Sequence, residues 1–349
     1  MSLFEHKEFD NHEQVVFCHD QETGLKAIIA VHDTTMGPAL GGTRMWNYAN
    51  SEEALTDVLR LSRGMTYKSA LAGLPLGGGK AVIIADAKTD KSDALFKSYG
   101  RFIDSLSGKY ITAEDVNIRT TDIAVIATQT RYVAGTAEKA GDPSPHTALG
   151  AYLGLKASVK HALGKDDLKG IRIALQGLGA VGYGLAEHCA KDGAILFVCD
   201  VNQEAVDRAV SKLGATAVGI DEIYDQDVDV YSPCALGATI NDDTLKRIKA
   251  KVIAGSANNQ LATAAHDKIV KDMGILYAPD YVINAGGVIH VCSEAASFSN
   301  EETAARVRNI YNTLDKIFTR SKDENRPTGE IADEMAREIL AAKASERKI

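Results

Sequence analysis

Residues 171–200 read IRIALQGLGAVGYGLAEHCAKDGAILFVCD and predict a strand, a tight turn, a helix and a second strand in immediate succession. The apolar run at 171–176 has the length of a buried strand, and the run at 194–199 has the same character. Between them the pattern is helical from 181 to about 191. This succession predicts two parallel strands joined by a crossover helix, with Asp200 directly after the second strand.

The turn in this stretch carries a glycine pattern with a specific physical use. Gly177, Gly179 and Gly182 fill the spacing G-x-G-x-x-G. The first permits a tight turn, the second lets the backbone approach a pyrophosphate, and the third lets the helix pack on the strand. Asp200, about 20 residues later, is placed to bind ribose hydroxyls and repel a 2′-phosphate, which predicts NAD rather than NADP. The alternative is a doubly wound domain without a nucleotide. We assign the same cofactor site to Leu178, Ala180 and Val181.

The rest of the second half repeats the alternation of strands and helices. Apolar runs of strand length lie at 227–234, 251–256 and 274–280. Residues 202–213 place apolar side chains on one helical face. We therefore predict an α/β fold with a parallel sheet covered on both faces. The loop AGDPSP at 140–145 precedes a helix at 146–163, so the doubly wound, Rossmann-type NAD-binding domain is expected at 143–327.

The first half predicts a separate α/β domain at 1–142, because 349 residues exceed what one hydrophobic core usually holds. Strands are expected at 25–33 and 80–86, and helices from Asn50 onward and at 95–106. The last residues, 328–349, predict one charged amphipathic helix. We expect that helix to pack back on the first domain or on a partner subunit.

Composition excludes several classes of protein. The net charge of −8 disfavours a nucleic-acid protein, because no basic excess exists to replace phosphate counterions. No apolar run approaches the roughly 18 residues of a membrane helix, and the start MSLFEHKEFD has no secretory signal. The five cysteines are scattered, which favours free thiols in a reducing compartment. We expect a cytoplasmic protein.

Three motifs in the first half carry candidate catalytic side chains: Lys80 in PLGGGK, Lys68 in MTYK and Asp115 in TAED. The glycines before Lys80 read as a loop that can bring backbone close to a ligand. A lysine at the start of an apolar strand is partly desolvated, which lowers its pKa and suits general-base work. Taken together, the three could bind a carboxylate, move a proton and hold an amine. Taken singly, each also reads as an ordinary solvated charge.

Longer motifs carry a resemblance to a known enzyme family. They are AIIAVHDTTMGPALGGTRMW, LSRGMTYKSA, LPLGGGKAVI, YITAEDV, SPCALGATI, VIAGSANNQL and YAPDYVINAGGVI, and with the glycine pattern they extend from about residue 14 to residue 320. The chain resembles the glutamate/leucine/phenylalanine/valine dehydrogenases, most of all the leucine dehydrogenases. The resemblance implies an N-terminal catalytic domain, a C-terminal NAD domain and a cleft that closes on an amino acid.

The resemblance also implies roles for single residues. Lys80 is the catalytic lysine, its pKa lowered by burial and a neighbouring cation, and it activates the water that attacks an iminium intermediate. Lys68 binds the substrate carboxylate, and Asp115 holds the amine and shuttles protons. Further substrate contacts are implied for Gly41, Gly42, Met65 and Asn259, and further cofactor contacts for Cys234, Ala235, Asn258 and Asn284.

By the same motif match, the side-chain pocket is lined by Leu40, Ala113, Val288 and Val291. Four apolar walls exclude a charged side chain and favour leucine, isoleucine and valine. The chain departs from the usual family pattern at Asn117, Ile118 and His290.

The implied activity is the reversible, NAD-dependent oxidative deamination of an aliphatic L-amino acid to a 2-oxo acid and ammonia. Alternatives are the same chemistry with phenylalanine, tryptophan or valine as the main substrate, a hydroxy-acid dehydrogenase, and a non-catalytic NAD-binding sensor. We expect no metal, since no His/Cys cluster has ligand spacing. A homo-oligomer is expected, with an octamer the first choice and a dimer the second.

Overall fold

The structure is a computed structural model that describes residues 3–135 and 141–346. The chain forms two compact units. The first unit contains the chain up to Gly141, Val291–Phe298 and the chain from Ala336, and the second contains Asp142–His290 and Ser299–Met335. The expected boundary between residues 142 and 143 lies next to the point where the chain passes from the first unit to the second, between Gly141 and Asp142. The assignment of catalysis to one part and NAD binding to the other stays a prediction.

The first unit is built on a five-stranded sheet in the order β1-β2-β4-β3-β5. Its strands are β1 (Gln14–Asp20), β2 (Leu25–Asp33), β3 (Ala39–Trp46), β4 (Gly77–Ile84) and β5 (Tyr110–Ala113). Strand β2 pairs antiparallel with β1 and β4, whereas β3 pairs parallel with β4 and β5. The predicted strand at 25–33 is confirmed, and the one at 80–86 begins earlier, at Gly77. A short 3-10 turn, Leu3–Glu5, precedes the sheet.

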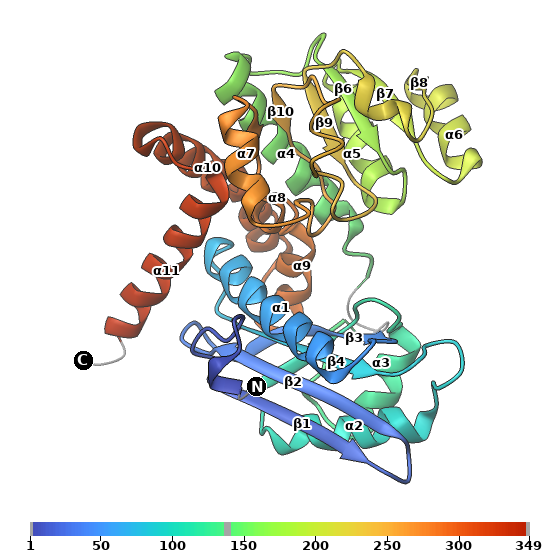
Figure 1. Cartoon of the computed structure of the whole chain (residues 1–349), viewed down its shortest axis with the longest axis vertical. Helices are drawn as coiled ribbons and strands as arrows, with labels where there is room; N and C mark the ends of the chain where they lie inside the picture. The colour runs from blue at the N-terminus through green and yellow to red at the C-terminus, as the bar shows by residue number, and fades with distance from the viewer. Residues whose placement is uncertain (1–2, 136–140, 347–349) are drawn as a thin grey trace. The chain divides into compact units, whose positions relative to one another are not determined.

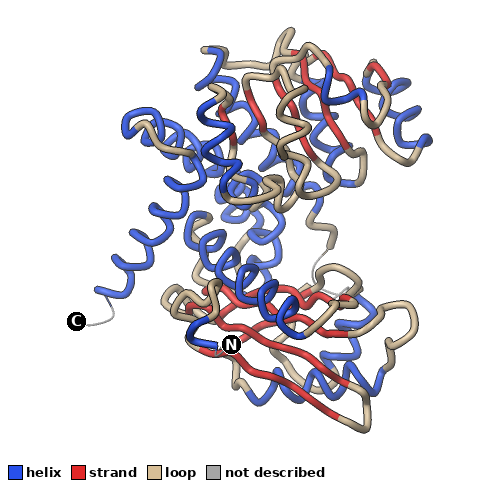
Figure 2. The backbone as a smooth tube through the Cα atoms, viewed as in Figure 1, coloured by secondary structure: helices blue, strands red, loops and turns tan. Residues whose placement is uncertain are grey.

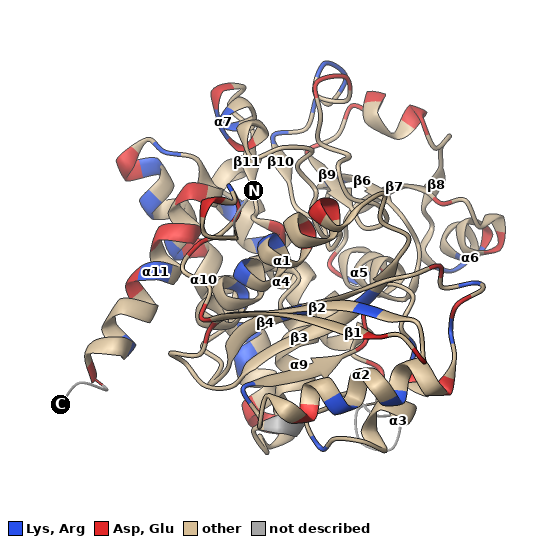
Figure 3. Cartoon of the chain, turned by 60° about the horizontal axis from the view of Figure 1, so that its bottom comes forward, with Lys and Arg blue, Asp and Glu red and all other residues tan. Residues whose placement is uncertain are grey.

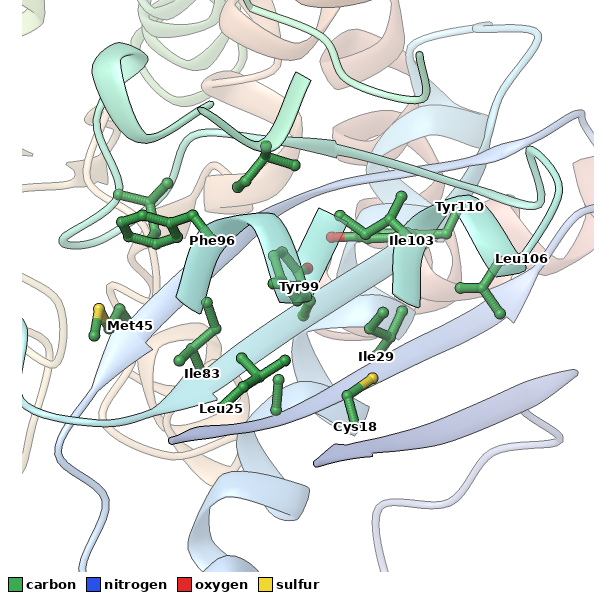
Figure 4. Packing of buried hydrophobic residues seen from close by; sticks show 14 of the residues in the cluster. Cys18, Leu25, Ile29, Met45, Ile83, Phe96, Tyr99, Ile103, Leu106 and Tyr110 are labelled. Carbon is green, nitrogen blue, oxygen red and sulfur yellow. The ribbon is translucent and has the colours of Figure 1, made fainter. Parts of the chain in front are cut away.

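Helices cover both faces of this sheet (Figure 1). They are α1 (Ser51–Leu71), α2 (Asp93–Ser105) and α3 (Thr120–Ala127). Asn50 caps α1 by accepting a hydrogen bond from the backbone of Glu53, as predicted. Helix α1 packs on β4 and β2, where Val58 and Leu59 join Val82 in one apolar cluster. On the other face, α2 and α3 pack on strand side chains that alternate with these. Figure 4 shows part of this cluster, including Ile29 and Ile83 of the strands and Phe96 and Tyr99 of α2.

The second unit is built on a six-stranded parallel sheet in the order β11-β10-β9-β6-β7-β8. Its strands are β6 (Arg172–Gln176), β7 (Ile195–Cys199), β8 (Thr216–Ala217), β9 (Val230–Pro233), β10 (Val252–Ile253) and β11 (Leu276–Tyr277). The strand order reverses between β6 and β9, which defines a doubly wound sheet and its switch point. The predicted parallel α/β sheet is confirmed. Strands β9, β10 and β11 are shorter than the apolar runs predicted at 227–234, 251–256 and 274–280, because the ends of these runs form loops.

The remaining helices are α4 (Ser144–Leu163), α5 (Ala180–Lys191), α6 (Gln203–Leu213), α7 (Ala265–Asp272), α8 (Asp280–Ile283), α9 (Gly286–Ala295), α10 (Asn300–Glu324) and α11 (Thr328–Glu346). A 3-10 turn lies at Glu222–Asp225. Helices α4 and α5 pack together and on the sheet, and α7 packs through Val270 into a cluster with Tyr231 and Ile253 (Figures 1 and 2). Helices α9 and α11 each contribute to both units.

Two of our expectations reach past the described residues. Ala140, the first residue of the predicted boundary loop, and 347–349 of the predicted C-terminal helix lie outside them. Residues 336–346 of α11 belong to the first unit, and 328–335 belong to the second.

Both acidic and basic residues occur along α2 and along α11 (Figure 3). Among the described residues, no helix combines the length and the hydropathy that crossing a membrane requires.

Candidate active site

Lys80 and Asp115 form an ion pair within the first unit. Lys80 lies on β4, and Asp115 follows the end of β5, on the opposite side of β3, which lies between these two strands. The Nζ atom of Lys80 lies 2.7 Å from Oδ2 of Asp115. The lysine side chain is only 8% exposed and the aspartate side chain 22%, so the pair is largely shielded from water. The structure therefore brings together the two residues predicted to be catalytic.

A glycine on β3 makes this approach possible. The register pairs Gly42 with Ala113 on β5, and the pairing of β3 with β4 places Gly42 level with Lys80. A Cβ atom on Gly42 would lie 2.9 Å from the Cβ of Asp115 and 2.2 Å from the backbone oxygen of Glu114. Any larger residue at this position would push Asp115 away from Lys80. Gly42 therefore has a steric role beyond the backbone contact that the family resemblance implies.

Three further side chains continue the network, and our sequence analysis did not find them. The Nε atom of Arg44, on β3, donates to Oδ2 of Asp115 at 3.2 Å, and its Nη1 donates to Oδ2 of Asp57, on α1, at 3.0 Å. The hydroxyl of Tyr48 donates to the same oxygen of Asp57 at 2.6 Å. The available signal was the spacing of Gly42 and Arg44, because residues two apart on a strand share one face.

The charges around Asp115 fix its ionisation. Burial alone would raise the pKa of the Asp115 carboxyl, but the positive charges of Lys80 and Arg44 and their hydrogen bonds outweigh burial, so the pKa lies below its usual value. We expected a cation as the neighbour that influences the pKa of Lys80. The burial of Lys80 is as expected, but the charged group bonded to it is the Asp115 carboxylate, because β5 ends beside it.

The glycines of PLGGGK form the first part of β4 and not a ligand-binding loop, which corrects our prediction. A Cβ on Gly78 would lie 2.0 Å from the backbone nitrogen of Thr66, on α1. The missing side chain therefore lets α1 lie directly against the strand that carries Lys80. Met65 and Lys68 flank this contact on α1, so both predicted substrate residues belong to the helix that covers the ion pair.

The glycine pattern of the second unit has the geometry expected of it. Gly177 has a φ of +103°, which favours glycine, and turns the chain from β6 toward α5. Gly179 is the N-cap of α5, and among the described residues no atom lies within 4 Å of where its Cβ would be. A Cβ on Gly182 would lie 2.1 Å from the oxygen of Gly177, so only glycine allows this close packing.

The other predicted cofactor residues lie at the same carboxyl edge of the sheet. Asp200, at the end of β7, accepts the backbone N–H of Leu178 at 2.5 Å and that of Asn202 at 2.8 Å, which fixes its carboxylate beside the glycine loop. Cys234 and Ala235 follow β9 and contact Gly182 and Gly177. Ligands of doubly wound sheets bind at this edge, next to the switch point.

Two asparagines form a second group in this unit. The Nδ2 atom of Asn284 donates to Oδ1 of Asn258 at 2.7 Å and to the backbone oxygen of Ser256 at 3.2 Å. Asn259 has a φ of 51°, a left-handed conformation that asparagine tolerates, and its carbonyl accepts the N–H of Ala238. The loop that carries Asn258 and Asn259 is therefore held by hydrogen bonds on both sides.

The predicted pocket residues divide between the units. Leu40 and Ala113 lie on β3 and β5 of the first unit. Val288 and Val291 lie on α9, where Val288 belongs to the second unit and Val291 to the first. Their common pocket stays a prediction.

The departures from the family pattern have local explanations. Asn117 adopts a left-handed φ of 60° and donates from Nδ2 to the backbone oxygen of Met45 at 3.0 Å. Ile118 is buried in the apolar core. The ring of His290 stacks on that of His146, with centroids 4.7 Å apart. On α9, His290 lies one residue before Val291, so the two side chains point in clearly different directions.

Two family models match the chain. Residues 12–132 match the Glu/Leu/Phe/Val dehydrogenase dimerisation domain, and residues 198–345 match the Glutamate/Leucine/Phenylalanine/Valine dehydrogenase model. The chain is 53% identical over 343 residues to a leucine dehydrogenase of Geobacillus stearothermophilus, covering 97% of this chain and 94% of the relative. The chain belongs to the glutamate/leucine/phenylalanine/valine dehydrogenase family. It is an amino-acid dehydrogenase, and the resemblance inferred from the motifs is confirmed.

Other members of this family have different substrates in their names. A phenylalanine dehydrogenase of Bacillus thermotolerans is 46% identical over 350 residues, covering 98% of this chain and 91% of the relative. The crystal structure of L-tryptophan dehydrogenase from Nostoc punctiforme superposes with a TM-score of 0.86 at 45% identity, covering 96% of this chain and 97% of that one. The two-unit α/β architecture is therefore that of the family.

Proposed function

We propose that this enzyme catalyses the reversible, NAD-dependent oxidative deamination of leucine, isoleucine and valine to the corresponding 2-oxo acid and ammonia. The buried pair of Lys80 and Asp115, 2.7 Å apart, is the observation that carries this proposal. A shielded amine beside a carboxylate can divide the two proton transfers of the reaction between them. The 53% identity to leucine dehydrogenases supports the choice of an aliphatic substrate.

In this mechanism the residues of the first unit bind and deprotonate the substrate. Lys68 pairs with the substrate carboxylate and, with the backbone of Gly41 and Gly42, orients the Cα–H bond. The substrate ammonium replaces the Lys80 ammonium at the Asp115 carboxylate, and Lys80 releases its proton to solvent. Asp115 then takes up the proton that the substrate ammonium loses before hydride transfer, and the neutral Nζ of Lys80 turns toward a water molecule.

The second half of the reaction is hydrolysis of the iminium that loss of hydride leaves on the substrate. Lys80 accepts a proton from water as the water oxygen bonds to the iminium carbon. Asp115 then returns its proton to the nitrogen and takes up the hydroxyl proton as the carbinolamine collapses to the 2-oxo acid and ammonia leaves. Each proton removed from water or amine is thus held by a named side chain.

The residues at the carboxyl edge of the second sheet fit NAD. The open N-cap at Gly179 leaves room for a pyrophosphate at the start of α5, and Asp200 presents a fixed carboxylate to ribose hydroxyls. When bound, NAD supplies the hydride acceptor. Further contacts are proposed for Leu178, Ala180, Val181, Cys234, Ala235, Asn258 and Asn284.

Substrate choice follows from the proposed apolar pocket of Leu40, Ala113, Val288 and Val291. The methyl group of Ala113 narrows the pocket, so Ala113→Gly should raise the ratio of kcat/KM for phenylalanine to that for leucine, by roughly 10-fold as for a methylene-sized change. The same assay with Asn259→Ala tests substrate binding by Asn259. An unchanged ratio in Ala113→Gly would remove Ala113 from the pocket.

The deciding experiment is an NADH absorbance assay with purified protein, NAD and one amino acid at a time. We expect turnover with leucine, isoleucine and valine, weak turnover with phenylalanine, and none with glutamate. Faster turnover of phenylalanine or tryptophan would assign the chain to the other substrate classes. Turnover of a 2-hydroxy acid alone, or binding of NAD without turnover, would reject the proposal.

We also propose a homo-oligomer, an octamer first and a dimer second, and a cytoplasmic location. The match of residues 12–132 to a dimerisation domain supports association of like chains. All five cysteines are free thiols and four are buried, which is typical of proteins in reducing compartments. Mass measurement in solution tests the subunit number.

A further inference from the structure

Two cationic side chains form ion pairs with the same carboxylate oxygen of Asp115. Lys80 Nζ lies 2.7 Å and Arg44 Nε 3.2 Å from the same Oδ2 atom. Arg44 in turn binds Asp57, which accepts the hydroxyl of Tyr48. The mechanism above uses the lysine and Asp115 but gives no role to the other three side chains.

We propose that Arg44 is a positioning residue for Asp115: it holds the carboxylate in place, and in its charged form, while Lys80 leaves it for water. This inference rests on the proposed function, because the movement of Lys80 is part of that mechanism. Arg44 touches neither substrate nor cofactor in the proposed mechanism and acts only through Asp115.

Asp115 needs a second cation when Lys80 turns away. Asp115, a carboxylate that is 22% exposed, lacks its closest cation until the substrate ammonium takes that place, and a shielded charge without a partner would be unstable. Arg44 stays charged at any pH of interest and cannot leave easily, since its second nitrogen is bound to Asp57. Tyr48 fixes Asp57 by a 2.6 Å hydrogen bond, which completes a chain from β3 to α1.

The surroundings of Asp115 leave few other groups to set its charge. Tyr110 on β5 donates its hydroxyl to the backbone oxygen of Gly41 at 2.6 Å, and burial raises the pKa of Tyr110 to about 12, so this hydroxyl stays neutral. Burial also raises the pKa of the Tyr48 hydroxyl well above its usual value. The neighbouring Glu114 has a raised pKa, first from burial and also from Asp122, opposed by the backbone N–H of Thr120.

Substitutions of Arg44 and of Asp57 are expected to shift the pH profile in opposite directions. Arg44→Gln removes a cation and raises the pKa of Asp115, so the acid limb of the kcat/KM profile moves up by about 1 pH unit or more. Asp57→Asn removes an anion but keeps an oxygen for Tyr48, so the limb moves to lower pH. Arg44→Lys restores the charge and returns the limb toward the wild-type position. If Arg44 and Asp57 had a purely structural role, Arg44→Gln and Asp57→Asn would move the acid limb in the same direction or leave it in place.

The experiment compares pH profiles of kcat/KM for leucine in the wild type and these three variants. The matched control is Arg63→Gln, which breaks the 3.3 Å ion pair of Arg63 with Glu8 in the same unit. We expect the control to keep the wild-type acid limb. An Arg44→Gln enzyme with a lower rate but an unmoved acid limb would overturn the positioning role.

A second measurement separates this inference from the proposed function. Infrared pH titration reads the C=O stretch of protonated carboxyls without turnover, and Asp115→Asn identifies the band of Asp115. We expect the midpoint of that band to rise in Arg44→Gln and to fall in Asp57→Asn. Unchanged midpoints would reject the inference even in an active enzyme. Shifted midpoints in a protein that turns over no amino acid would reject only the proposed function.

Discussion

Lys80 is the side chain on which the proposed chemistry depends most directly. Lys80→Ala removes the base that activates water, and we expect kcat to fall by a factor of about 10² or more. Asp115 keeps its bond to Arg44 in this variant, so the fold should persist. The matched control is Lys91→Ala, which breaks the ion pair with Asp122 in the same unit. Steady-state rates with leucine decide: wild-type turnover in Lys80→Ala would reject the mechanism.

Asp200 is the residue that should separate the two nicotinamide cofactors. Its carboxylate is fixed by two backbone N–H groups, so it cannot turn away from a 2′-phosphate. Like charges at close range in a shielded site cost several kcal/mol, so we expect a kcat/KM for NAD at least about 10²-fold above that for NADP. Asp200→Ala should narrow the ratio, whereas Asp207→Ala, on α6, should leave it unchanged. Equal efficiency of the wild-type enzyme with both cofactors would contradict the assignment.

The sequence predicted part of the candidate site and missed a definable remainder. Lys80 and Asp115 lie in motifs from which a catalytic role could be predicted, and the structure places the two side chains in contact. Arg44 and Asp57 lie in no such motif. Charged residues of these types are common, and the role of each depends on the strand or helix that the fold places beside it. The steric need for Gly42 was invisible for the same reason: it depends on the register of β3 with β5.

At the scale of elements, the glycines of the α5 turn allow a test that separates packing from ligand binding. A methyl on Gly182 would lie 2.1 Å from a backbone oxygen, whereas one on Gly179 meets open space among the described residues. We expect Gly182→Ala to lower the melting temperature by several degrees, in line with overpacking costs of about 1–3 kcal/mol. Gly179→Ala should keep the melting temperature but weaken NAD binding. Calorimetric unfolding and NAD titration of both variants measure these effects, and equal melting temperatures would contradict the packing role.

The elements themselves were predictable where their signal is local. The strand β2 was found with its bounds, and the cap of α1 at Asn50 was found from two residues. Helix α10 was missed, although Ser299 and Glu302 form a capping box and Ile310 and Leu314 follow a helical period. The two-residue strands β10 and β11 are defined by their parallel partners, and no local pattern specifies where such a strand ends.

At the scale of the whole molecule, the course of the chain between the units could not be predicted. Val291–Phe298 and the residues from Ala336 return to the first unit although they follow most of the second in sequence. That arrangement depends on packing between segments far apart in the chain. The start of α11 shows one such contact, because the buried Asp267 of α7 accepts the backbone N–H of Glu330 at 3.2 Å.

Asp267 makes global stability depend on pH in a defined direction. Burial, only partly offset by the N–H groups of Glu330 and Gly329, raises the pKa of Asp267 from 3.8 to about 6. The folded chain therefore holds this proton more tightly than the unfolded chain, and stability falls as pH rises from about 4 to about 6, by about 3 kcal/mol. The buried His12, whose pKa is lowered from 6.5 to about 4, adds the opposite slope between about pH 4 and pH 6.5.

The difference between Asp267→Asn and the wild type isolates the effect of Asp267, because His12 is present in both proteins and cancels. The amide keeps an oxygen for the N–H of Glu330 but carries no charge. We expect the free energy of unfolding of Asp267→Asn, relative to wild type, to increase between pH 4 and pH 6 by about 3 kcal/mol and then to stay level. Urea unfolding at several pH values measures it. Since burial is the largest cause that raises this pKa, ahead of the charges of Glu330 and Asp333, a difference that is flat across the whole range would mean that water reaches Asp267 and that the start of α11 is not closed over it.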